Sequence, residues 1–322
     1  MASLYFTGTG ICPKNWAKEI CVIEIKRKRK KGKMLKRGTL KAFGAPFNIE
    51  HSSCSNIKPT LFDWTKSDSD IEVFIDYSIV QESFSIPKKQ SVLRVGWLCE
   101  SVTIYGNLYE YIKYNYKNIF SSLDFVFTSD KYLLSLDPRF KFAYSCSNIP
   151  WTPREFWGIY PKTKKCSMIC SNKKSCKEHL YRHSVAQIYK DKVDIYGGAF
   201  DSPYTGEKYD NFYKKENALK DYMFSIVIQN NFNSYFFAEM LTDCFAYGTI
   251  PIYLGNPEIG NFFDENGIIQ YKGGFDIGTL NEELYNSKMN AINNNLERIK
   301  SMPMSDDYLY EQCTNIYRGN YE

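Results

Sequence analysis

Apolar and polar positions along the chain form two alternating patterns, short apolar runs and longer amphipathic stretches. The short runs predict strands over residues 71–79, 92–98, 124–127, 142–145, 166–170, 193–196, 224–228 and 249–254. The amphipathic stretches predict helices over residues 108–119, 176–189, 236–246, 280–299 and 306–316, and a short one near Tyr132. Strands that alternate with helices are typical of α/β units around parallel sheets, and the alternation occurs twice. The expected fold class is therefore α/β.

Prolines, tryptophans and a glycine interrupt the pattern in the middle of the chain. They are Pro150, Trp151, Pro153, Trp157, Gly158 and Pro161. Such residues break regular elements. We therefore predict one domain over residues 1–155 and a second over residues 156–322, with the terminal helices packing across the two.

The size and composition agree with a globular protein of two domains. The chain has 322 residues, of which 43% are apolar and 24% charged. Ten cysteines without a regular spacing do not form the framework of a small disulfide-rich protein. Residues 1–10 lack the features of a secretion signal, and no apolar run approaches the ~18 residues of a membrane span. We expect a cytoplasmic protein without a transmembrane segment.

One segment carries most of the excess positive charge. The net charge is +5, and ten basic residues lie between Lys26 and Lys41 without an acidic one. The other 31 basic and 36 acidic residues sum to −5. A single basic patch on a mildly acidic body disfavours nucleic acid as a partner. Two interpretations stay open for residues 26–41: a solvated hairpin that turns at Gly32, or a peripheral contact with an anionic membrane or substrate.

Candidate chemistry lies directly after the expected strands, because ligands of doubly wound sheets bind at the carboxyl ends of the strands. Glu100 follows the strand 92–98, Gly197 follows 193–196, and Asn230 follows 224–228. A strand-end carboxylate suits the deprotonation of an attacking hydroxyl. Taken alone, however, Glu100 also fits an ordinary surface residue.

The loop after the strand 166–170 has the features of a phosphate site. Ser171 or Asn172 would cap the helix 176–189, whose free amides attract anions. Lys173, Lys174 and Arg182 would add positive charge there. The chain has neither a G-x-G-x-x-G sequence nor a P-loop, which disfavours a dehydrogenase or a kinase.

Residues 225–255, SIVIQNNFNSYFFAEMLTDCFAYGTIPIYLG, resemble the donor-binding signature of the family 10 glycosyltransferases, the α1,3/4-fucosyltransferases. The resemblance continues upstream in CSMICSNKKSCKEHLYRHSVAQIYKDKVDIYGG and downstream in NPEIGNFFDENGIIQY. More loosely, VGWLCES and DFVFTSDKYLL are similar to the acceptor-side domain of that family. No resemblance extends before about residue 70.

The resemblance implies a GT-B architecture, in which two Rossmann-like domains face each other across a cleft. Residues 1–155 would be the acceptor-side domain and residues 156–322 the domain that binds the nucleotide sugar. The implied reaction is the inverting transfer of fucose from GDP-fucose to a hydroxyl of a glycan acceptor. It implies neither a metal ion nor a tightly bound cofactor.

The resemblance also assigns roles to individual residues. Glu100 would be the general base, and Arg182 would bind the diphosphate. Glu239 would bind the ribose, and Asn230 would line the donor site. Tyr196 and Gly197 would lie beside the nucleobase.

Three residues depart from the family pattern. Met240 replaces a lysine that contacts the diphosphate, Gln229 replaces a glutamate and Ala238 a threonine. Lys173 and Lys174 are candidates to supply the missing charge, or else they are an exposed helix start. The departures leave two alternatives open: a transferase for another nucleotide sugar, or an inactive relative that binds a nucleotide or a glycan.

Five thiol and imidazole side chains form a rival constellation that suits zinc. They are Cys166, Cys170, Cys176, His179 and His183. The alternative is that the cysteines are buried in a strand and that the histidines are polar members of the helix carrying Arg182.

Overall fold

The computed structural model describes residues 38–44, 57–198, 213–232 and 235–321. Residues 37–322 form one compact unit. Within it the described strands form two sheets, and every pairing between them is parallel.

The first sheet has six strands in the order β2-β1-β3-β4-β5-β6. The strands are β1 (Gly38–Phe43), β2 (Phe62–Thr65), β3 (Ile71–Ile75), β4 (Leu93–Trp97), β5 (Phe125–Thr128) and β6 (Phe140–Phe142). The helices α2 (Ser78–Gln81), α3 (Gly106–Ser122) and α4 (Lys131–Leu136) connect them. Every residue of β3 and β4 is buried, as expected for strands with both faces covered.

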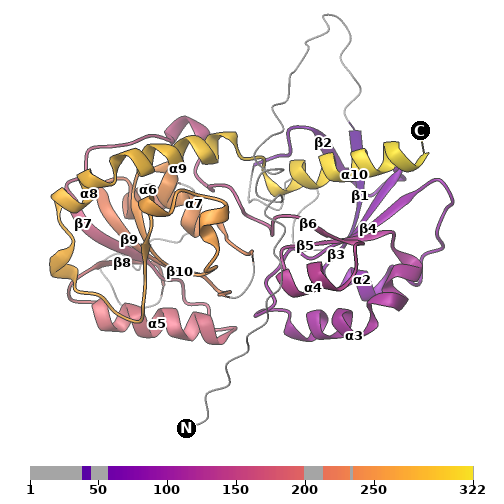
Figure 1. Ribbon diagram of the computed structural model, residues 1–322, viewed down its shortest axis with the longest axis horizontal. Helices are drawn as coiled ribbons and strands as arrows, with labels where there is room; N and C mark the ends of the chain where they lie inside the picture. Colours follow the sequence, from indigo (N-terminus) through magenta and orange to yellow (C-terminus); the bar gives the residue numbers. More distant parts are fainter. Residues whose placement is uncertain (1–37, 45–56, 199–212, 233–234, 322) are drawn as a thin grey trace, which may run out of the picture. The chain divides into compact units, whose positions relative to one another are not determined.

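The second sheet has five strands in the order β11-β10-β9-β7-β8. The strands are β7 (Lys164–Ile169), β8 (Asp194–Tyr196), β9 (Tyr222–Ile228), β10 (Ile250–Leu254) and β11 (Ile269–Gln270). The helices around it are α5 (Lys177–Tyr189), α6 (Tyr213–Leu219), α7 (Glu239–Ala246), α8 (Glu282–Ser287) and α9 (Met289–Ser301). Figure 1 shows the two sheets with their helices. The expected α/β class is confirmed, since both sheets are parallel and helices surround them.

The last helix, α10 (Ser305–Tyr321), packs on the first sheet rather than on the second (Figure 1). Leu309 and Cys313 are fully buried in the core of the first sheet. Asp306 accepts a hydrogen bond from the Trp64 indole at 2.8 Å, and Asp307 accepts one from the Thr60 amide at 2.9 Å. The terminal helices therefore divide between the sheets, because α8 and α9 pack around the second one.

An aromatic cluster joins the end of β6 and the segment after it to α10 and to elements of the second sheet. Tyr144 lies with its ring centre 5.9 Å from that of Phe237 and 5.0 Å from that of Tyr308. Phe142 lies 6.1 Å from Phe262 by the same measure. Because this core is shared, residues 37–322 pack as one unit, and the division near residue 155 stays a prediction.

The sequence patterns missed several elements and misjudged others. The expected strand 142–145 overlaps β6 only at Phe142, and the expected helix 280–299 is divided into α8 and α9. Residues 71–79 are not one strand, because β3 ends at Ile75 and α2 begins at Ser78. The missed elements are β1, β2, α6 and β11. Most of the expected basic hairpin lies outside the described residues, but Lys41 belongs to β1, between β2 and β3. Its ammonium pairs with Asp68 at 3.0 Å and with Glu72 at 3.5 Å, so Lys41 is part of a sheet and not of a hairpin arm.

Candidate functional site

The carboxyl ends of β7, β8, β9 and β10 bring together loops that are far apart in sequence. Gly198 lies beside Asn172, since a Cβ atom on Gly198 would stand 3.6 Å from the Asn172 Cβ. Gly255 lies so close to Gln229 that a Cβ atom there would stand 2.8 Å from the Gln229 Cγ. The loop after β7 thus adjoins the one after β8, and the loop after β9 adjoins the one after β10.

Arg182 reaches this edge from α5. Its side chain is 6% exposed, and its Nε donates a hydrogen bond to the Ile228 carbonyl at 2.9 Å. Among the described residues, its two terminal nitrogens make no hydrogen bond. Burial lowers the pKa of Arg182, and the negative charge of Glu239 opposes that shift. The guanidinium therefore stands at the end of β9, within electrostatic range of Glu239, with donors left for an anion.

Glu239 opens α7 and is held by a buried lysine that the sequence did not reveal as a site residue. The Lys215 ammonium lies 3.4 Å from Glu239 and 2.5 Å from Asp243. It also lies 4.4 Å from the centre of the Trp151 ring. Burial lowers the pKa of Lys215, but the two carboxylates outweigh burial, and the pKa lies above its usual value. Lys215 thus orients Glu239 as a charged partner.

Lys215 was missed because α6 was not predicted. The signal available was Asp243, a carboxylate on the buried face of the amphipathic helix, which requires a positive partner when it is buried.

Lys173 and Lys174 lie in the loop after β7 and are exposed. The helix α5 begins only at Lys177, its N-cap is Cys176, and no side chain caps it. The expectation that Ser171 or Asn172 caps this helix is therefore wrong, because the loop continues past both residues before the helix begins. Whether the two lysines contact a ligand stays a prediction.

Tyr196 and Gly197 end β8 at the same edge of the sheet. The Tyr196 ring is buried, and its hydroxyl lies 2.8 Å from that of Tyr222. Gly197 has a φ of 101°, which favours glycine over any residue with a side chain. The Tyr196 side chain thus belongs to the core, while Gly197 lies in the turn at the carboxyl end of β8. The role of both residues beside a nucleobase stays a prediction.

Glu100 follows β4 at the carboxyl edge of the first sheet. Its Oε1 accepts a hydrogen bond from the Ser101 amide at 2.7 Å, and its carbonyl accepts one from the Tyr109 hydroxyl at 2.7 Å. Its own amide donates to Asp76 at 3.3 Å. The Glu100 side chain is half-buried, so the carboxylate is held in place while part of it stays accessible.

One contact joins the loop of Glu100 to the loop of Asn230. The Thr103 hydroxyl donates a hydrogen bond to the Asn230 carbonyl and lies 3.0 Å from the Ser101 hydroxyl. The structure thereby brings the strand-end loop of the first sheet against the strand-end loop of β9. No pattern in the sequence indicated Thr103.

Two buried amides at the ends of β9 and β10 have unused donors. The Nε2 of Gln229 and the Nδ2 of Asn256 are buried and have no hydrogen-bond partner in the described part of the chain. The side chains are 1% and 2% exposed, respectively. Buried amides without a partner are uncommon and require a reason, such as a water or a ligand.

The described residues hold no group of three or more histidine, cysteine or acidic side chains arranged to bind a metal ion. His179 lies 3.2 Å from the Ser175 hydroxyl, and the His183 Nε2 lies 3.1 Å from the Lys173 carbonyl. Burial and the nearby Arg182 lower the pKa of His179 to about 4. The constellation of cysteines and histidines considered for zinc does not come together, since its histidines have other partners.

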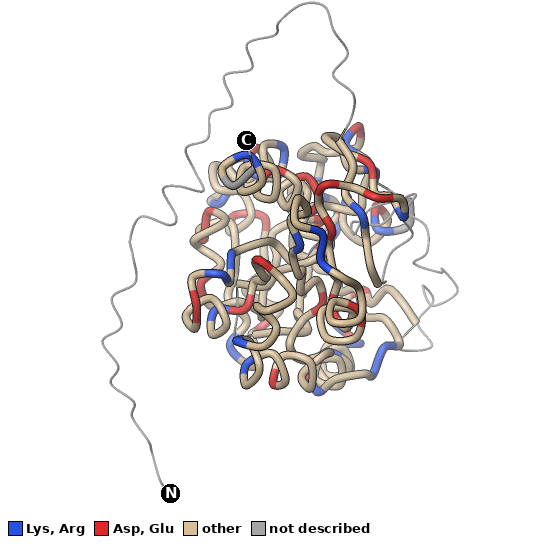
Figure 2. The backbone as a smooth tube through the Cα atoms, turned by 90° about the vertical axis from the view of Figure 1, so that its right-hand side faces the viewer, with Lys and Arg blue, Asp and Glu red and all other residues tan. Residues whose placement is uncertain are grey.

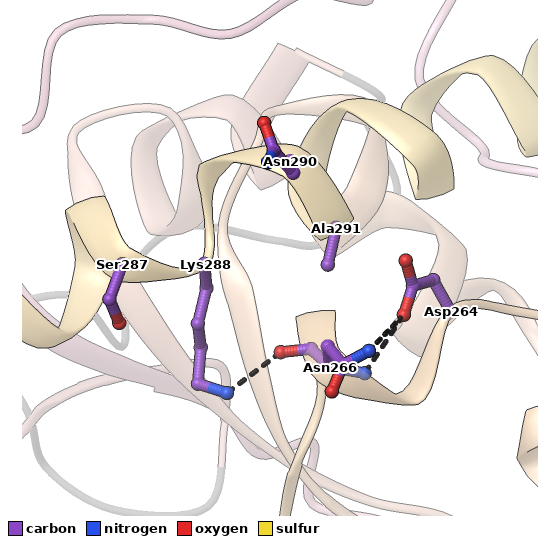
Figure 3. A pocket seen from close by; sticks show the side chains of 6 residues that line it. All are labelled: Asp264, Asn266, Ser287, Lys288, Asn290 and Ala291. Atoms are coloured by element: carbon purple, nitrogen blue, oxygen red, sulfur yellow. Dashed lines mark hydrogen bonds between the residues drawn. The ribbon is translucent and has the colours of Figure 1, made fainter.

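A polar pocket of about 320 Å³ lies elsewhere, among helices and loops around the second sheet. Its lining residues are Asp264, Asn266, Ser287, Lys288, Asn290 and Ala291. Figure 3 shows the Lys288 ammonium on the Asn266 carbonyl and the Asn266 nitrogens on Asp264. These residues either precede β11 or span the end of α8 and the start of α9. The pocket is therefore at the amino end of a parallel strand and separate from the candidate site.

The distribution of charge and the apolar character of the helices bear on binding to nucleic acid and to membranes. Basic and acidic residues are interspersed along the backbone, as Figure 2 shows. A search of the described helices for one with the length and apolar character of a bilayer span finds none.

The chain matches no protein-family model and no curated protein. A crystal structure of an α1,3-fucosyltransferase is similar with a TM-score of 0.49 and 11% identity, over 91% of this chain and 93% of that one. An α1,3-fucosyltransferase crystallised with GDP-fucose gives a TM-score of 0.44 and 12% identity, over 90% and 94%. Sucrose-phosphate synthase from Thermosynechococcus elongatus gives 0.46 and 11%, over 78% and 73%. At these identities the similarity concerns the fold alone.

Proposed function

We propose that this protein is an inverting glycosyltransferase that transfers fucose from GDP-fucose to a hydroxyl of a glycan acceptor. One observation carries the proposal. Arg182 and Glu239 gather at the end of β9, and the contact between Thr103 and Asn230 brings the loop of Glu100 to the same strand end. An anion site with a carboxylate nearby is what group transfer from a nucleotide sugar needs.

In the proposed reaction Glu100 removes the proton of the acceptor hydroxyl. The hydroxyl oxygen forms a bond to the anomeric carbon as the bond from that carbon to the diphosphate breaks. The unused donors of Arg182 stabilise the negative charge that develops on the departing GDP. The single displacement inverts the anomeric carbon and needs no metal ion on the diphosphate.

In this proposal the nucleoside of the donor binds at the carboxyl edge of the second sheet. Glu239, held by Lys215, would accept hydrogen bonds from the ribose hydroxyls, and Asn230 would line the pocket. Tyr196 and Gly197 would lie beside the guanine through the turn that follows β8. Lys173 and Lys174 are exposed near the same edge and would supply part of the charge that Met240 lacks.

The departures at Gln229, Ala238 and Met240 keep another nucleotide sugar, or an inactive nucleotide-binding protein, as alternatives. Calorimetric titration with GDP, UDP and their fucose, mannose and glucose derivatives separates them. We expect tighter binding of GDP than of UDP, and transfer from GDP-fucose detected by mass spectrometry of a glycan library. Equal affinity for GDP and UDP would remove the fucosyl assignment, and binding without transfer would favour the inactive relative.

A cytoplasmic location and contact with anionic membrane between Lys26 and Lys41 are separate proposals that rest on the sequence. The membrane contact is tested by co-sedimentation with vesicles that contain about a third phosphatidylserine. Binding should fall steeply as salt rises, since exposed charges are screened. A chain with the basic residues from Lys26 to Arg37 replaced by serine is the control, since Lys41 pairs with Asp68 and Glu72 in the sheet. Equal binding of both chains would rule out the contact.

A further inference from the structure

Asp76 has a backbone conformation that is rare for a residue with a side chain. It follows β3 at the carboxyl edge of the first sheet, with a φ of 48°. Among the described residues only Ser147 shares a positive φ without being glycine. Left-handed residues other than glycine persist where the surrounding structure holds them and often lie at functional sites.

The contacts of Asp76 fix the end of β4. Its amide donates to the Trp97 carbonyl at 3.0 Å, and its Oδ1 accepts hydrogen bonds from the amides of Cys99 at 2.9 Å and Glu100 at 3.3 Å. The conformation of Asp76 therefore sets the direction in which the chain leaves β4. Glu100, the proposed base, is one of the two residues whose amides bond to Asp76.

The second oxygen of Asp76 has no such role. Asp76 is 1% exposed, and its Oδ2 is buried without a hydrogen-bond partner in the described part of the chain. An unpartnered buried oxygen disfavours a charged carboxylate and favours a carboxylic acid that carries its proton there.

The titratable groups that face Asp76 come from two elements. They are Cys99 and Glu100 after β4, and Tyr105 and Tyr109 at the start of α3. Burial raises the pKa of Asp76 to about 7, and the negative charge of Glu100 adds to the shift, while the two amide hydrogen bonds oppose it. In the described part of the chain, no basic side chain contributes to that shift.

We propose that Asp76 is a positioning residue for Glu100, because it fixes the Cys99–Glu100 peptide. In addition, the proton on its unpartnered oxygen determines whether Glu100 faces a neutral acid or a second negative charge. This inference rests on the proposed function of Glu100 as a base. When Asp76 loses its proton, the added negative charge makes Glu100 a stronger proton acceptor. When Asp76 is protonated, its hydrogen bonds to the Cys99 and Glu100 amides remain, but its negative charge no longer assists Glu100.

The pH profile of kcat tests the electrostatic part. Asp76→Asn keeps an acceptor oxygen and tolerates the positive φ, but stays neutral. We expect the wild type and this variant to have equal kcat at pH 6, and the wild type to be about threefold to tenfold faster at pH 8.5. The control is Asp130→Asn, since Asp130 is also a strand-end acid with a pKa raised by burial but bonds to Leu133 in α4. Parallel profiles of the wild type and Asp76→Asn would overturn the electrostatic role.

Hydrogen exchange tests the positioning part without relying on transfer. Asp76→Gly tolerates the backbone conformation but removes both hydrogen bonds, whereas Asp76→Asn keeps them. We expect the Cys99 and Glu100 amides to exchange at least tenfold faster in Asp76→Gly than in Asp76→Asn, measured by mass spectrometry of peptides spanning them. Equal exchange in the two variants would overturn the positioning role. If Asp76→Gly exchanges faster than Asp76→Asn but the wild type transfers no sugar, the positioning role is supported and the proposed function fails.

Thermal melting supplies a second measurement on the same variants. Since the pKa of Asp76 is raised in the folded protein, the folded state binds more protons than the unfolded state between about pH 4 and 7. The contribution of Asp76 to stability therefore falls as the pH rises through that window. Asp76→Asn should lack this fall, and an identical pH dependence of the two proteins would contradict a protonated Asp76.

Discussion

The Thr103 hydroxyl donates a hydrogen bond to the Asn230 carbonyl, joining the loop after β4 to the loop after β9. Glu100 lies three residues before Thr103, and the hydroxyls of Ser101 and Thr103 lie 3.0 Å apart. The loop that carries the proposed base is thus tied to the strand end where Arg182 bonds Ile228. Reactions between two bound substrates depend on such placement, because orientation accounts for a large part of the barrier.

Glu100→Gln should abolish sugar transfer while leaving GDP binding intact. The amide has nearly the shape of the carboxylate but cannot accept the acceptor's proton, so kcat should fall about 100-fold to 10,000-fold. Transfer is measured by mass spectrometry and the Kd of GDP by calorimetry. The matched control is Glu110→Gln, an exposed glutamate of α3 that pairs with Lys113 at 3.5 Å, which should behave as the wild type. A Glu100→Gln variant as active as the control would mean that another group is the base.

Arg182→Met should weaken the binding of nucleotide diphosphates. Loss of a charge-assisted contact costs about 1.5 to 3 kcal/mol, which corresponds to an increase of about tenfold to 100-fold in the Kd of GDP. Guanosine itself should bind the variant and the wild type equally, since it lacks the diphosphate. Lys173→Met and Lys174→Met remove the same charge at exposed positions and should raise the Kd of GDP by less than Arg182→Met. A larger effect at either lysine would move the diphosphate site toward the loop after β7.

Much of the fold could be predicted from the sequence because its central strands are continuous apolar runs. The expected ends of β4 and β9 lie within one or two residues of the observed ends. Buried parallel strands are continuous apolar runs, which are visible in the sequence. β1 and β2 were missed because β1 begins inside a basic segment and β2 has only four residues, FDWT, of which two are buried. Their place in the sheet depends on partners distant in the chain, such as Asp306 and Asp307 of α10.

Part of the candidate site followed from the rule that ligands bind at strand ends, and the rest depended on tertiary contacts. Glu100 and Asn230 could be selected because each follows a predictable strand. Lys215, Thr103 and Asp76 could not, since nothing in their neighbouring residues indicates what they contact. A buried lysine on two carboxylates is recognised only when the helices that carry them are packed together.

Lys215→Met should destabilise the fold and disturb Glu239. Removing one partner of a buried ion pair leaves uncompensated charge, which costs about 3 to 5 kcal/mol of the free energy of unfolding. The double variant with Asp243→Asn should recover much of that loss, because the second charge is then also removed and the asparagine oxygen still accepts from the Trp151 amide. Urea denaturation measures both, and a double variant no more stable than Lys215→Met would contradict the charge argument.

Asp306→Ala should lower stability through the first sheet and leave nucleotide binding unchanged. Asp306 is fully buried and accepts the Trp64 indole hydrogen bond at 2.8 Å. The variant removes this buried hydrogen bond, at a cost of about 1 to 3 kcal/mol. Urea denaturation followed by tryptophan fluorescence reports the loss, and Asp276→Ala, which removes an exposed cap of η4 (Ile277–Thr279), is the control. An unchanged midpoint would mean that α10 contributes little to the stability of the first sheet.

Gln229→Met should raise the stability of the free protein and weaken the binding of GDP-fucose. The Gln229 Nε2 is buried without a partner in the described residues, so replacing the amide by an apolar group of similar volume removes a desolvation penalty of about 1 to 3 kcal/mol. The free energy of unfolding without ligand should therefore rise. If the amide donates to the bound nucleotide sugar, the Kd of GDP-fucose should rise about fivefold or more at the same time. Gln270→Met, at an exposed position of β11, should change neither quantity. A gain in stability with an unchanged Kd would place Gln229 outside the donor contacts, whereas a loss of stability would show that the amide has a partner, such as a buried water, in the free protein.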